Sequence, residues 1–300
     1  MADVTDAAFR QIIAKYGKPD IMWTEFVSAD GLMSAGRKKL LVDLKFIKVE
    51  QPIVAQIFGR RPENFFGAAK LLKKLGFAGV DINMGCPEKS VCRQGSGAAL
   101  IKEPELAREI IKATIKGAGG LPVSVKTRTG FSKNQVKEWL PELLKEDLAA
   151  VIIHARTRKE MSKVAADWSA VKLAVEIRNK LKSKTLIVGN GDVKDLIDAR
   201  QKAKETGCDG VMLGRAMFGN PWLFNEKIKE VSLADKLEVL TEHTRLFEKL
   251  LAKHKNFDLM KKHLKAYVSG FDGAKELRMK LMTAKNAKEV ERIIRFFLKI

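Results

Sequence analysis

The feature that most constrains the fold is a regular alternation of short apolar segments with amphipathic helical segments, which continues to about Phe224. Apolar segments of this length that are separated by crossover helices predict strands paired in parallel. Their near-continuous hydrophobicity indicates strands that are buried on both faces. We count seven strands, at 21–28, 52–59, 79–87, 122–130, 149–157, 185–193 and 210–217, with helices between them such as 62–75, 104–116, 133–146 and 193–205.

A doubly wound sheet and a (β/α)8 TIM barrel both agree with this alternation. The barrel is favoured because polar or reactive side chains end almost every strand, whereas a doubly wound sheet gathers them at one switch point. A barrel needs eight strands, and residues 1–6 have the pattern of a loop after a strand, followed by a helix Ala7–Tyr16 that Thr5 or Asp6 caps. We therefore expect an α/β TIM barrel whose first strand is missing from this chain, through a misassigned start or a truncation, or a barrel closed in some other way.

From about Ser232 the pattern becomes all-helical. Asn286 with Glu289 predicts a helix start, and the apolar side chains that follow share one face of that helix. A second basic helix is expected near 258–269. The sequence thus predicts two domains, a barrel over 1–231 and a small helical domain over 232–300.

The charge is strongly positive and unevenly placed. The chain has 56 Lys and Arg against 36 Asp and Glu, a net charge of +20 with a pI near 9.8. Residues 243–300 hold 15 Lys and Arg and 6 Asp and Glu, so +9 of the +20 lies in this tail. An organism whose proteins are generally rich in lysine would account for the total charge, but not for its concentration in this tail. A basic surface attracts polyanions, above all the phosphates of a nucleic acid.

Several classes of protein are disfavoured by composition. No apolar run approaches the ~20 residues of a membrane span, and the N-terminus lacks the pattern of a signal peptide. The three cysteines, Cys86, Cys92 and Cys208, are too few for a disulfide framework and agree with a reducing compartment. We expect a cytoplasmic protein that has no membrane partner and binds no metal.

Polar side chains interrupt or end the predicted strands where a barrel would carry its chemistry. Asn83 and Cys86 lie where an apolar strand stops at Gly-Cys-Pro. Gln56 and Lys126 lie inside apolar strands, and His154 ends another. An unpaired buried ammonium is costly, so Lys126 faces a ligand or a partner unless it reaches the rim. His154 alone is more typical of a hydrogen-bonded packing residue, but three such placements on three strands favour a site.

Two glycine-containing loops follow the last two strands. Gly189-Asn190-Gly191-Asp192 follows one strand and Gly214-Arg215 follows the next. In a complete barrel these would be strands seven and eight, whose loops commonly bind phosphate through backbone N–H groups and a cation. Glycine at these positions is also typical of ordinary turns, so each loop alone is weak evidence, whereas the pair with Arg215 favours a cofactor that carries phosphate.

Cys86 allows three interpretations. A disulfide with Cys92 is disfavoured in a reducing compartment, and a metal site would need more Cys or His nearby. A catalytic thiol remains, and an unperturbed thiol of pKa ~8.5 is mostly protonated at neutral pH, so it can act as a general acid or as a nucleophile.

In their order along the chain, these motifs resemble the tRNA-dihydrouridine synthases, most closely the bacterial B-type branch. The resemblance rests on 2–10 (ADVTDAAFR), 83–87 (NMGCP), 126–130 (KTRTG), 154–158 (HARTR), 189–192 (GNGD) and 214–221 (GRAMFGNP), and more weakly on 260–264 and 273–278. It covers essentially the whole barrel. The strand and the proline that precede Met1 in the family's pattern are absent, which puts the flavin affinity of this chain in question.

The resemblance implies an FMN-dependent enzyme that reduces the 5,6 double bond of a uridine in tRNA, with NADPH restoring the flavin. Cys86 matches the proton donor. The flavin contacts it implies are Gln56, Lys126 and His154 around the ring system, Asn190, Gly191, Asp192, Gly214 and Arg215 at the phosphate and ribitol, and Met1 and Ala2 at a turn that touches the flavin. From the chemistry we expect Asn83 to bind the uracil edge, and Arg156, Arg158 and the helical domain 232–300 to grip the RNA.

Two other functions remain open at this point. An FMN oxidoreductase acting on a small metabolite such as a free pyrimidine would share the barrel and the phosphate loops, but it would leave the basic tail without a purpose. A barrel that binds RNA and has lost catalysis would not need Cys86, Lys126, His154 and Arg215 together. The sequence does not identify the target uridine or distinguish NADPH from NADH, and a monomer is expected only by default.

Overall fold

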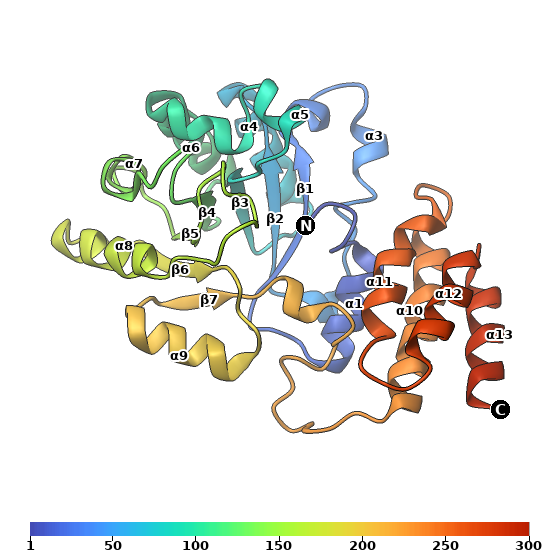
Figure 1. Ribbon diagram of the computed structural model, residues 1–300. Coiled ribbons are helices and arrows are strands. Elements are labelled where there is room, and N and C mark those ends of the chain that lie inside the picture. Colours follow the sequence, from blue (N-terminus) through green and yellow to red (C-terminus); the bar gives the residue numbers. More distant parts are fainter. Residues whose placement is uncertain (300) are drawn as a thin grey trace. The chain divides into compact units, whose positions relative to one another are not determined.

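The structure is a computed structural model that describes residues 1–299. A seven-stranded sheet has the order β1 to β7, so each strand lies beside the next strand of the sequence (Figure 1). All the pairs from β2 to β7 are parallel. The strands are β1 (Met22–Ser28), β2 (Ile53–Phe58), β3 (Gly79–Met84), β4 (Val123–Arg128), β5 (Ala150–His154), β6 (Leu186–Asn190) and β7 (Gly210–Met212). This is the strand order of a (β/α)8 barrel with seven strands in the described residues, and the predicted fold class is confirmed.

All seven predicted strands exist, but each is shorter than predicted, and the last one is shortened most. Extended structure was expected over 210–217, whereas β7 ends at Met212 and Arg215–Met217 forms the 3₁₀ turn η3. The N–H of Phe218 donates to the carbonyl of Arg215 at 3.1 Å, an i to i+3 bond that replaces strand pairing. The sequence after Gly214 therefore forms a local turn.

Helices follow most of the strands, and two of them begin at a residue that sequence rules favour. The longer ones are α4 (Pro62–Lys74), α6 (Pro104–Ala118), α7 (Val136–Leu143), α8 (Ser169–Lys180) and α9 (Leu196–Thr206). Pro62 and Pro104 stand in first turns, where the missing N–H costs nothing. Helix α7 begins three residues later than predicted, because the N–H of Gln135 returns to the carbonyl of Thr129 at 2.8 Å and keeps 130–135 in a turn.

Shorter elements connect these parts. They are α2 (Ala29–Leu32), α3 (Arg37–Leu40), α5 (Lys89–Arg93), η1 (Lys48–Glu50) and η2 (Gly97–Lys102). Helix α5 and η2 follow β3, and the glycine-rich turn 95–98 runs from the gap between them into η2, so together they form the loop region just beyond Cys86.

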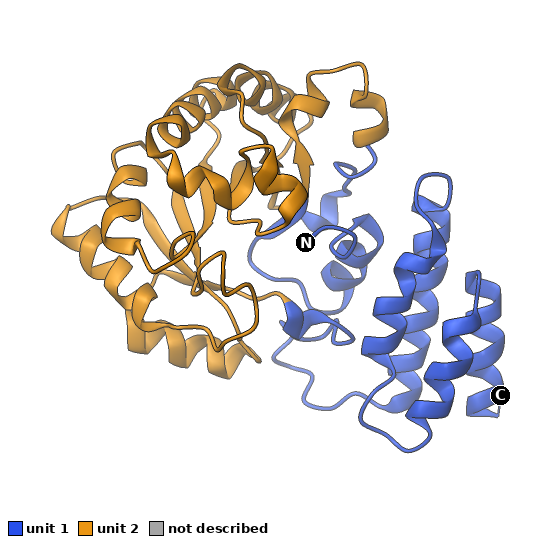
Figure 2. Ribbon diagram, turned by 45° about the horizontal axis from the view of Figure 1, so that its top comes forward, with its two compact units in different colours: residues 1–25, 41–51, 215–300 blue, residues 26–40, 52–214 orange. Residues whose placement is uncertain are grey.

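By internal packing the chain divides into two compact units (Figure 2). Unit 2 consists of 26–40 and 52–214 and holds β2 to β7 with their helices. Strands β2 to β5 have fully buried apolar side chains, as at Ile57, Val80, Ile82, Val125 and Val151, whereas β6 and β7 are more exposed. Such strands, covered on both faces, explain the continuous hydrophobic runs in the sequence.

Unit 1 consists of 1–25, 41–51 and the chain from 215 onward. It contains α1 (Ala7–Tyr16), η1 and the helical tail, which is α10 (Leu233–Leu251), η4 (Phe257–Met260), α11 (Lys261–Tyr267), α12 (Ala274–Thr283) and α13 (Ala287–Leu298). Helix α1 packs against α10, so an N-terminal segment belongs to the helical unit. The predicted domain boundary at 231/232 stays a prediction.

The predicted tail helices are confirmed. The Asn286 side chain caps α13 by accepting from the N–H of Glu289 at 2.9 Å. Val290 and Ile294 are buried on its inner face with Leu237, Leu264 and Leu281 from the other tail helices, which accounts for the amphipathic pattern. In residues 1–299 no helix is both long enough and apolar enough to cross a membrane.

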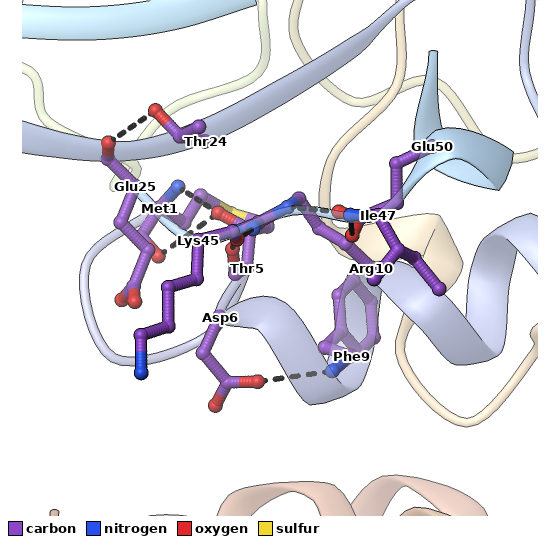
Figure 3. A network of polar contacts seen from close by, with 10 residues as sticks. All are labelled: Met1, Thr5, Asp6, Phe9, Arg10, Thr24, Glu25, Lys45, Ile47 and Glu50. Atoms are coloured by element: carbon purple, nitrogen blue, oxygen red, sulfur yellow. Dashed lines mark hydrogen bonds and ion pairs between the residues drawn. The ribbon is translucent and has the colours of Figure 1, made fainter. Parts of the chain in front are cut away.

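A buried polar network holds the N-terminal part of unit 1 together (Figure 3). The Asp6 side chain caps α1 by accepting from the N–H of Phe9 at 2.9 Å, as predicted. The Arg10 guanidinium donates to Glu50 at 2.7 Å and to the carbonyls of Thr5 at 2.7 Å and Lys45 at 2.6 Å. This one side chain therefore links α1, the turn before it and the segment 41–51.

Candidate active site

A row of polar side chains crosses three neighbouring strands of unit 2 inside an otherwise apolar sheet. Gln56 of β2 is in register with Asp81 of β3, and Asp81 is in register with Ser124 of β4. The Asp81 carboxylate accepts from Gln56 Nε2 and from Ser124 Oγ, both at 2.6 Å. Asp81 is completely buried, and this loss of hydration raises the pKa of its carboxyl to about 6, against the two hydrogen bonds that lower it.

Asn83 lies two residues farther along β3 and shapes the turn that carries Cys86. Its amide Nδ2 donates to Gln56 Oε1 at 3.0 Å, and its Oδ1 accepts from the N–H groups of Gly85 at 3.1 Å and Cys86 at 2.9 Å. An Asn side chain that bonds backbone groups just after it is a common way to fix a turn. The predicted pair Asn83 and Cys86 is therefore a connected unit.

Cys86 lies at the end of this turn and is 9 % exposed as a whole residue. Burial raises the pKa of its thiol, so the thiol keeps its proton at neutral pH. The carbonyl of Cys86 accepts from the N–H of Ala98 at 3.0 Å, and Gly97 passes beside it with a φ of +59°. A Cβ on Gly97 would lie 2.9 Å from that carbonyl oxygen, so glycine permits the close approach.

Lys126 lies on β4 directly opposite Asn83 of β3. Its Nζ donates to Asn190 Oδ1 at 3.1 Å, and the Asn190 amide in turn donates to the carbonyl of Met212 at 2.8 Å. Loss of hydration lowers the pKa of the Lys126 ammonium to about 8, while the nearby Asp81 carboxylate favours the charged form. The structure thus brings together two predicted site residues, Lys126 and Asn190, across β4 to β6.

His154 ends β5, in register with Arg128 on one side and Asn190 on the other. Burial, with the charges of Lys126, Arg128 and Arg156, lowers the pKa of His154 to about 2, so the ring is neutral. Its Nε2 lies 3.2 Å from the Arg156 guanidinium. A neutral ring beside a donor accepts a hydrogen bond there and holds its proton on the other nitrogen.

The loop after β6 closes against His154 and Arg156. Arg156 forms an ion pair with Asp192, which also accepts from the N–H of Ala166 at 2.9 Å. Gly191 has a φ of +129°, and a Cβ there would lie 2.9 Å from the Cβ of Ala166. Gly191 therefore meets a backbone and packing requirement of this loop.

The predicted RNA-gripping arginines have different surroundings. Arg156 is 3 % exposed and is engaged with Asp192, His154 and the carbonyl of Val164 at 2.7 Å. It therefore stabilises the loop from inside the protein. Arg158 is half-buried, with its guanidinium 5.3 Å from the centre of the Phe131 ring, and its Nε has no hydrogen-bond partner within residues 1–299. Its expected role with RNA stays a prediction.

Three predicted cofactor contacts belong to unit 1 and are described separately from the others. Met1 and Ala2 form the turn before α1, where the carbonyl of Met1 accepts from the N–H groups of Val4 and Thr5 at 3.1 Å. Arg215 begins η3 and is exposed. Gly214 ends unit 2 just after β7. Their roles as flavin contacts stay predictions.

Sequence reasoning did not single out three residues that organise the site. Asp81 and Ser124 complete the polar row, and both interrupt apolar strands as Gln56 and Lys126 do, so the same signal identifies them. The Arg128 guanidinium donates to the carbonyls of Gly85 at 2.8 Å, Thr157 at 3.0 Å and Met161 at 3.1 Å, joining the Cys86 turn to the loop after β5. In the described part of the chain no group of three or more His, Cys, Asp or Glu could hold a metal ion.

The profile of the dihydrouridine synthase (Dus) family matches residues 1–299. The chain belongs to the dihydrouridine synthase family. A probable tRNA-dihydrouridine synthase of Staphylococcus aureus (strain MRSA252) is 39% identical over 297 residues, which cover 98% of this chain and 90% of that protein. Probable tRNA-dihydrouridine synthase 2 of Bacillus subtilis (strain 168) is 40% identical over 297 residues, covering 98% and 91%. The resemblance seen in the motifs is confirmed.

Similar solved structures have distant sequences and bear on the fold alone. The old yellow enzyme homologue from Zymomonas mobilis superposes with a TM-score of 0.52 at 16% identity, over 77% of this chain and 86% of that one. A 2-naphthoyl-CoA reductase gives a TM-score of 0.56 at 14% identity, over 76% and 47%. Morphinone reductase gives 0.53 at 11% identity, over 74% and 80%. These likenesses agree with the barrel-type strand order of this member of the Dus family.

Proposed function

We propose that the protein reduces the C5–C6 double bond of a uridine in tRNA to 5,6-dihydrouridine, with FMN as its flavin and NADPH as electron donor. The observation that carries the proposal is the Cys86 turn. A buried thiol that keeps its proton stands on a turn held by Asn83, and the neighbouring strand β4 carries the half-buried ammonium of Lys126. Family membership supplies the reaction class to which this arrangement is suited.

The residues present fit a flavin. Lys126 is half-buried, and within residues 1–299 its ammonium bonds to one amide oxygen, so it can also donate to an anionic group. The neutral His154 ring and the amides of Gln56 and Asn190 add hydrogen-bonding groups of both kinds at the same strand ends. We assign the flavin ring system to Gln56, Lys126 and His154, its phosphate and ribitol to Asn190, Gly191, Asp192, Gly214 and Arg215, and the remaining contact to Met1 and Ala2.

FMN, when bound, supplies the hydride that reaches C6 of the uracil, and NADPH restores the flavin. The addition of hydride to C6 leaves negative charge over C5 and O4, and Cys86 gives its thiol proton to C5. Because burial raises the pKa of this thiol, Cys86 is protonated before the reaction and is a strong enough base afterwards to recover a proton from solvent. Lys126 stabilises negative charge as it develops nearby.

Recognition of the substrate requires the uridine to leave its stack, since a base inside a helix cannot reach a strand end. We assign the uracil edge to Asn83 and the RNA backbone to Arg158 and to the basic helices of 232–300. Arg156 supports this surface through the loop it holds. We expect the protein to act as a monomer in the cytoplasm.

The test compares tRNA with the small molecule of the alternative function. The protein, loaded with FMN and supplied with NADPH, is given a tRNA transcript without modified bases, or free uridine and uracil. Our proposal predicts dihydrouridine in the tRNA and negligible turnover of free uridine and uracil. Failure to bind tRNA at low salt together with turnover of free uracil would instead establish a small-metabolite oxidoreductase.

A further inference from the structure

We propose that Asp81 is a positioning residue that sets the orientation of the Gln56 and Asn83 amides and thereby the conformation of the Cys86 turn. This inference rests on the proposed function of Cys86 and adds to it a residue that contacts neither the thiol nor its backbone. The inference follows from a series of hydrogen bonds in which each side chain fixes the orientation of the next.

The first link is the Asp81 carboxylate. In its ionised form it has acceptor oxygens only, so the Gln56 side chain can approach it at 2.6 Å only with its Nε2. A flipped Gln56 amide would place two oxygens against one another in a site without solvent, because Asp81 is completely buried. The orientation of Gln56 is therefore decided by Asp81.

The second link is Asn83. With Nε2 of Gln56 committed to Asp81, the Oε1 of Gln56 faces β3 and accepts from Asn83 Nδ2 at 3.0 Å. This leaves Asn83 Oδ1 on the side of the turn, where it accepts from the N–H groups of Gly85 and Cys86. A flipped Asn83 would direct its NH₂ group at those two N–H donors. The orientation that holds the turn is therefore the one that Gln56 requires.

Ser124 provides the comparison that separates positioning from simple burial of a charge. It donates to the other oxygen of Asp81 at 2.6 Å, so it satisfies the carboxylate as well as Gln56 does. It has no link to Asn83 among the hydrogen bonds of the described residues. If Asp81 mattered only as a buried charge that needs partners, removing the Ser124 hydroxyl would disturb the site as much as breaking the link through Gln56.

The test measures the alkylation rates of individual cysteines by mass spectrometry, in the folded protein loaded with its flavin. Cys208 lies in the same unit and is also buried, so the ratio of Cys86 to Cys208 alkylation separates local release of the turn from general loosening. The variants are Asp81→Leu, which ends the chain of bonds, Asp81→Asn, which can still present an oxygen to Gln56 and its NH₂ to Ser124, and Ser124→Ala. Gln56→Met breaks the same chain if Asp81→Leu does not fold.

We expect the Cys86 to Cys208 ratio to rise about tenfold in Asp81→Leu or Gln56→Met, the effect of losing roughly one buried hydrogen bond on the closed turn. It should stay within about twofold of wild type in Asp81→Asn and in Ser124→Ala, where the turn keeps its bonds. In single turnovers, uridine reduction should slow in Asp81→Leu and recover in Asp81→Asn.

Equal ratios in Asp81→Leu and wild type would overturn the inference, as would an increase in Ser124→Ala as large as that in Asp81→Leu. A wild-type protein that forms no dihydrouridine would count against the proposed function, while the alkylation ratios would still decide the role of Asp81.

Discussion

The buried ion pair between Arg10 and Glu50 predicts a large effect of one small substitution, Glu50→Gln. Both side chains are almost inaccessible, at 2 % and 0 % exposure. Glu50 accepts two hydrogen bonds on different oxygens, from Arg10 Nε at 2.7 Å and from the N–H of Ile47 at 2.9 Å. Gln has one oxygen, so its NH₂ group must face one of these two donors.

The expected cost combines these two losses. Arg10 keeps its charge and its bonds to the carbonyls of Thr5 and Lys45, but no anion remains to balance it. Breaking a buried pair by neutralising one partner costs about 3–5 kcal/mol. The exposed pair between Lys15 and Glu242 is the control, because an ion pair open to water contributes at most about 1 kcal/mol.

Amide hydrogen exchange measures the effect locally. The N–H groups of Glu50 and Gln51 bond to the carbonyls of Ile47 and Lys48, and they report on opening of the segment 41–51. A loss of 3 kcal/mol corresponds to roughly 150-fold faster exchange in Glu50→Gln. Glu242→Gln should change these rates by less than about fivefold. Exchange in Glu50→Gln as slow as in Glu242→Gln would refute the reasoning.

Three further predictions follow from the described contacts. The ring nitrogens of His263 are buried without partners within residues 1–299, and burial lowers its pKa from 6.5 to about 4. The folded protein then binds fewer protons than the unfolded chain between these values, so stability falls as the pH drops through that window. His263→Phe should raise the free energy of unfolding at neutral pH by about 1–3 kcal/mol. In urea titrations at several pH values it should also remove up to about 1.4 kcal/mol per pH unit from the pH dependence of that free energy. An unchanged pH dependence would contradict this. Gly191→Ala should lower the free energy of unfolding by more than about 2 kcal/mol and reduce the flavin content, because the added Cβ would meet Ala166. Gly207→Ala is the control: its added Cβ would have its nearest neighbour at 3.7 Å, so it should lose only the roughly 1–2 kcal/mol of a left-handed backbone. Equal melting temperatures of the two variants would refute the difference. Because the pKa of Lys126 is lowered to about 8, the rate of uridine reduction should decline as the pH rises through that value, and Lys126→Arg should shift the decline upward; the same profile in both proteins would exclude Lys126 as its source.

Much of the fold could be predicted because apolar runs and helix caps are local signals. Asp6 and Asn286 cap their helices as the sequence indicated, and every predicted strand exists. The strand expected over 210–217 was too long because a 3₁₀ turn at Arg215 depends on packing that no short pattern records. Helix α1 packs against α10 although the two are more than 200 residues apart in the sequence, and a local sequence pattern does not predict such a contact.

The candidate site was predicted in its parts but not in its connections. A polar residue inside an apolar strand is visible in the sequence, which is why Gln56 and Lys126 were identified, and Asn83 was identified because a strand stops just after it at Gly-Cys-Pro. That Asp81 and Gln56 are partners depends on the register between β2 and β3, which the sequence does not state. Arg156 was a candidate for gripping RNA, which stays a prediction; its ion pair with Asp192 joins the loops after β5 and β6, and the sequence does not state that contact.

Nucleoside mass spectrometry on tRNA is the most direct test of the central claim, that this site reduces a uridine with Cys86 as the proton donor. Unmodified tRNA is incubated with FMN, NADPH and either wild-type protein or Cys86→Ala of equal flavin content. We predict that wild type adds two hydrogens to a uridine and that Cys86→Ala does so at least about 100-fold more slowly while binding tRNA equally well. Absence of dihydrouridine with the flavin-loaded wild type, or equal rates in the two proteins, would contradict the account.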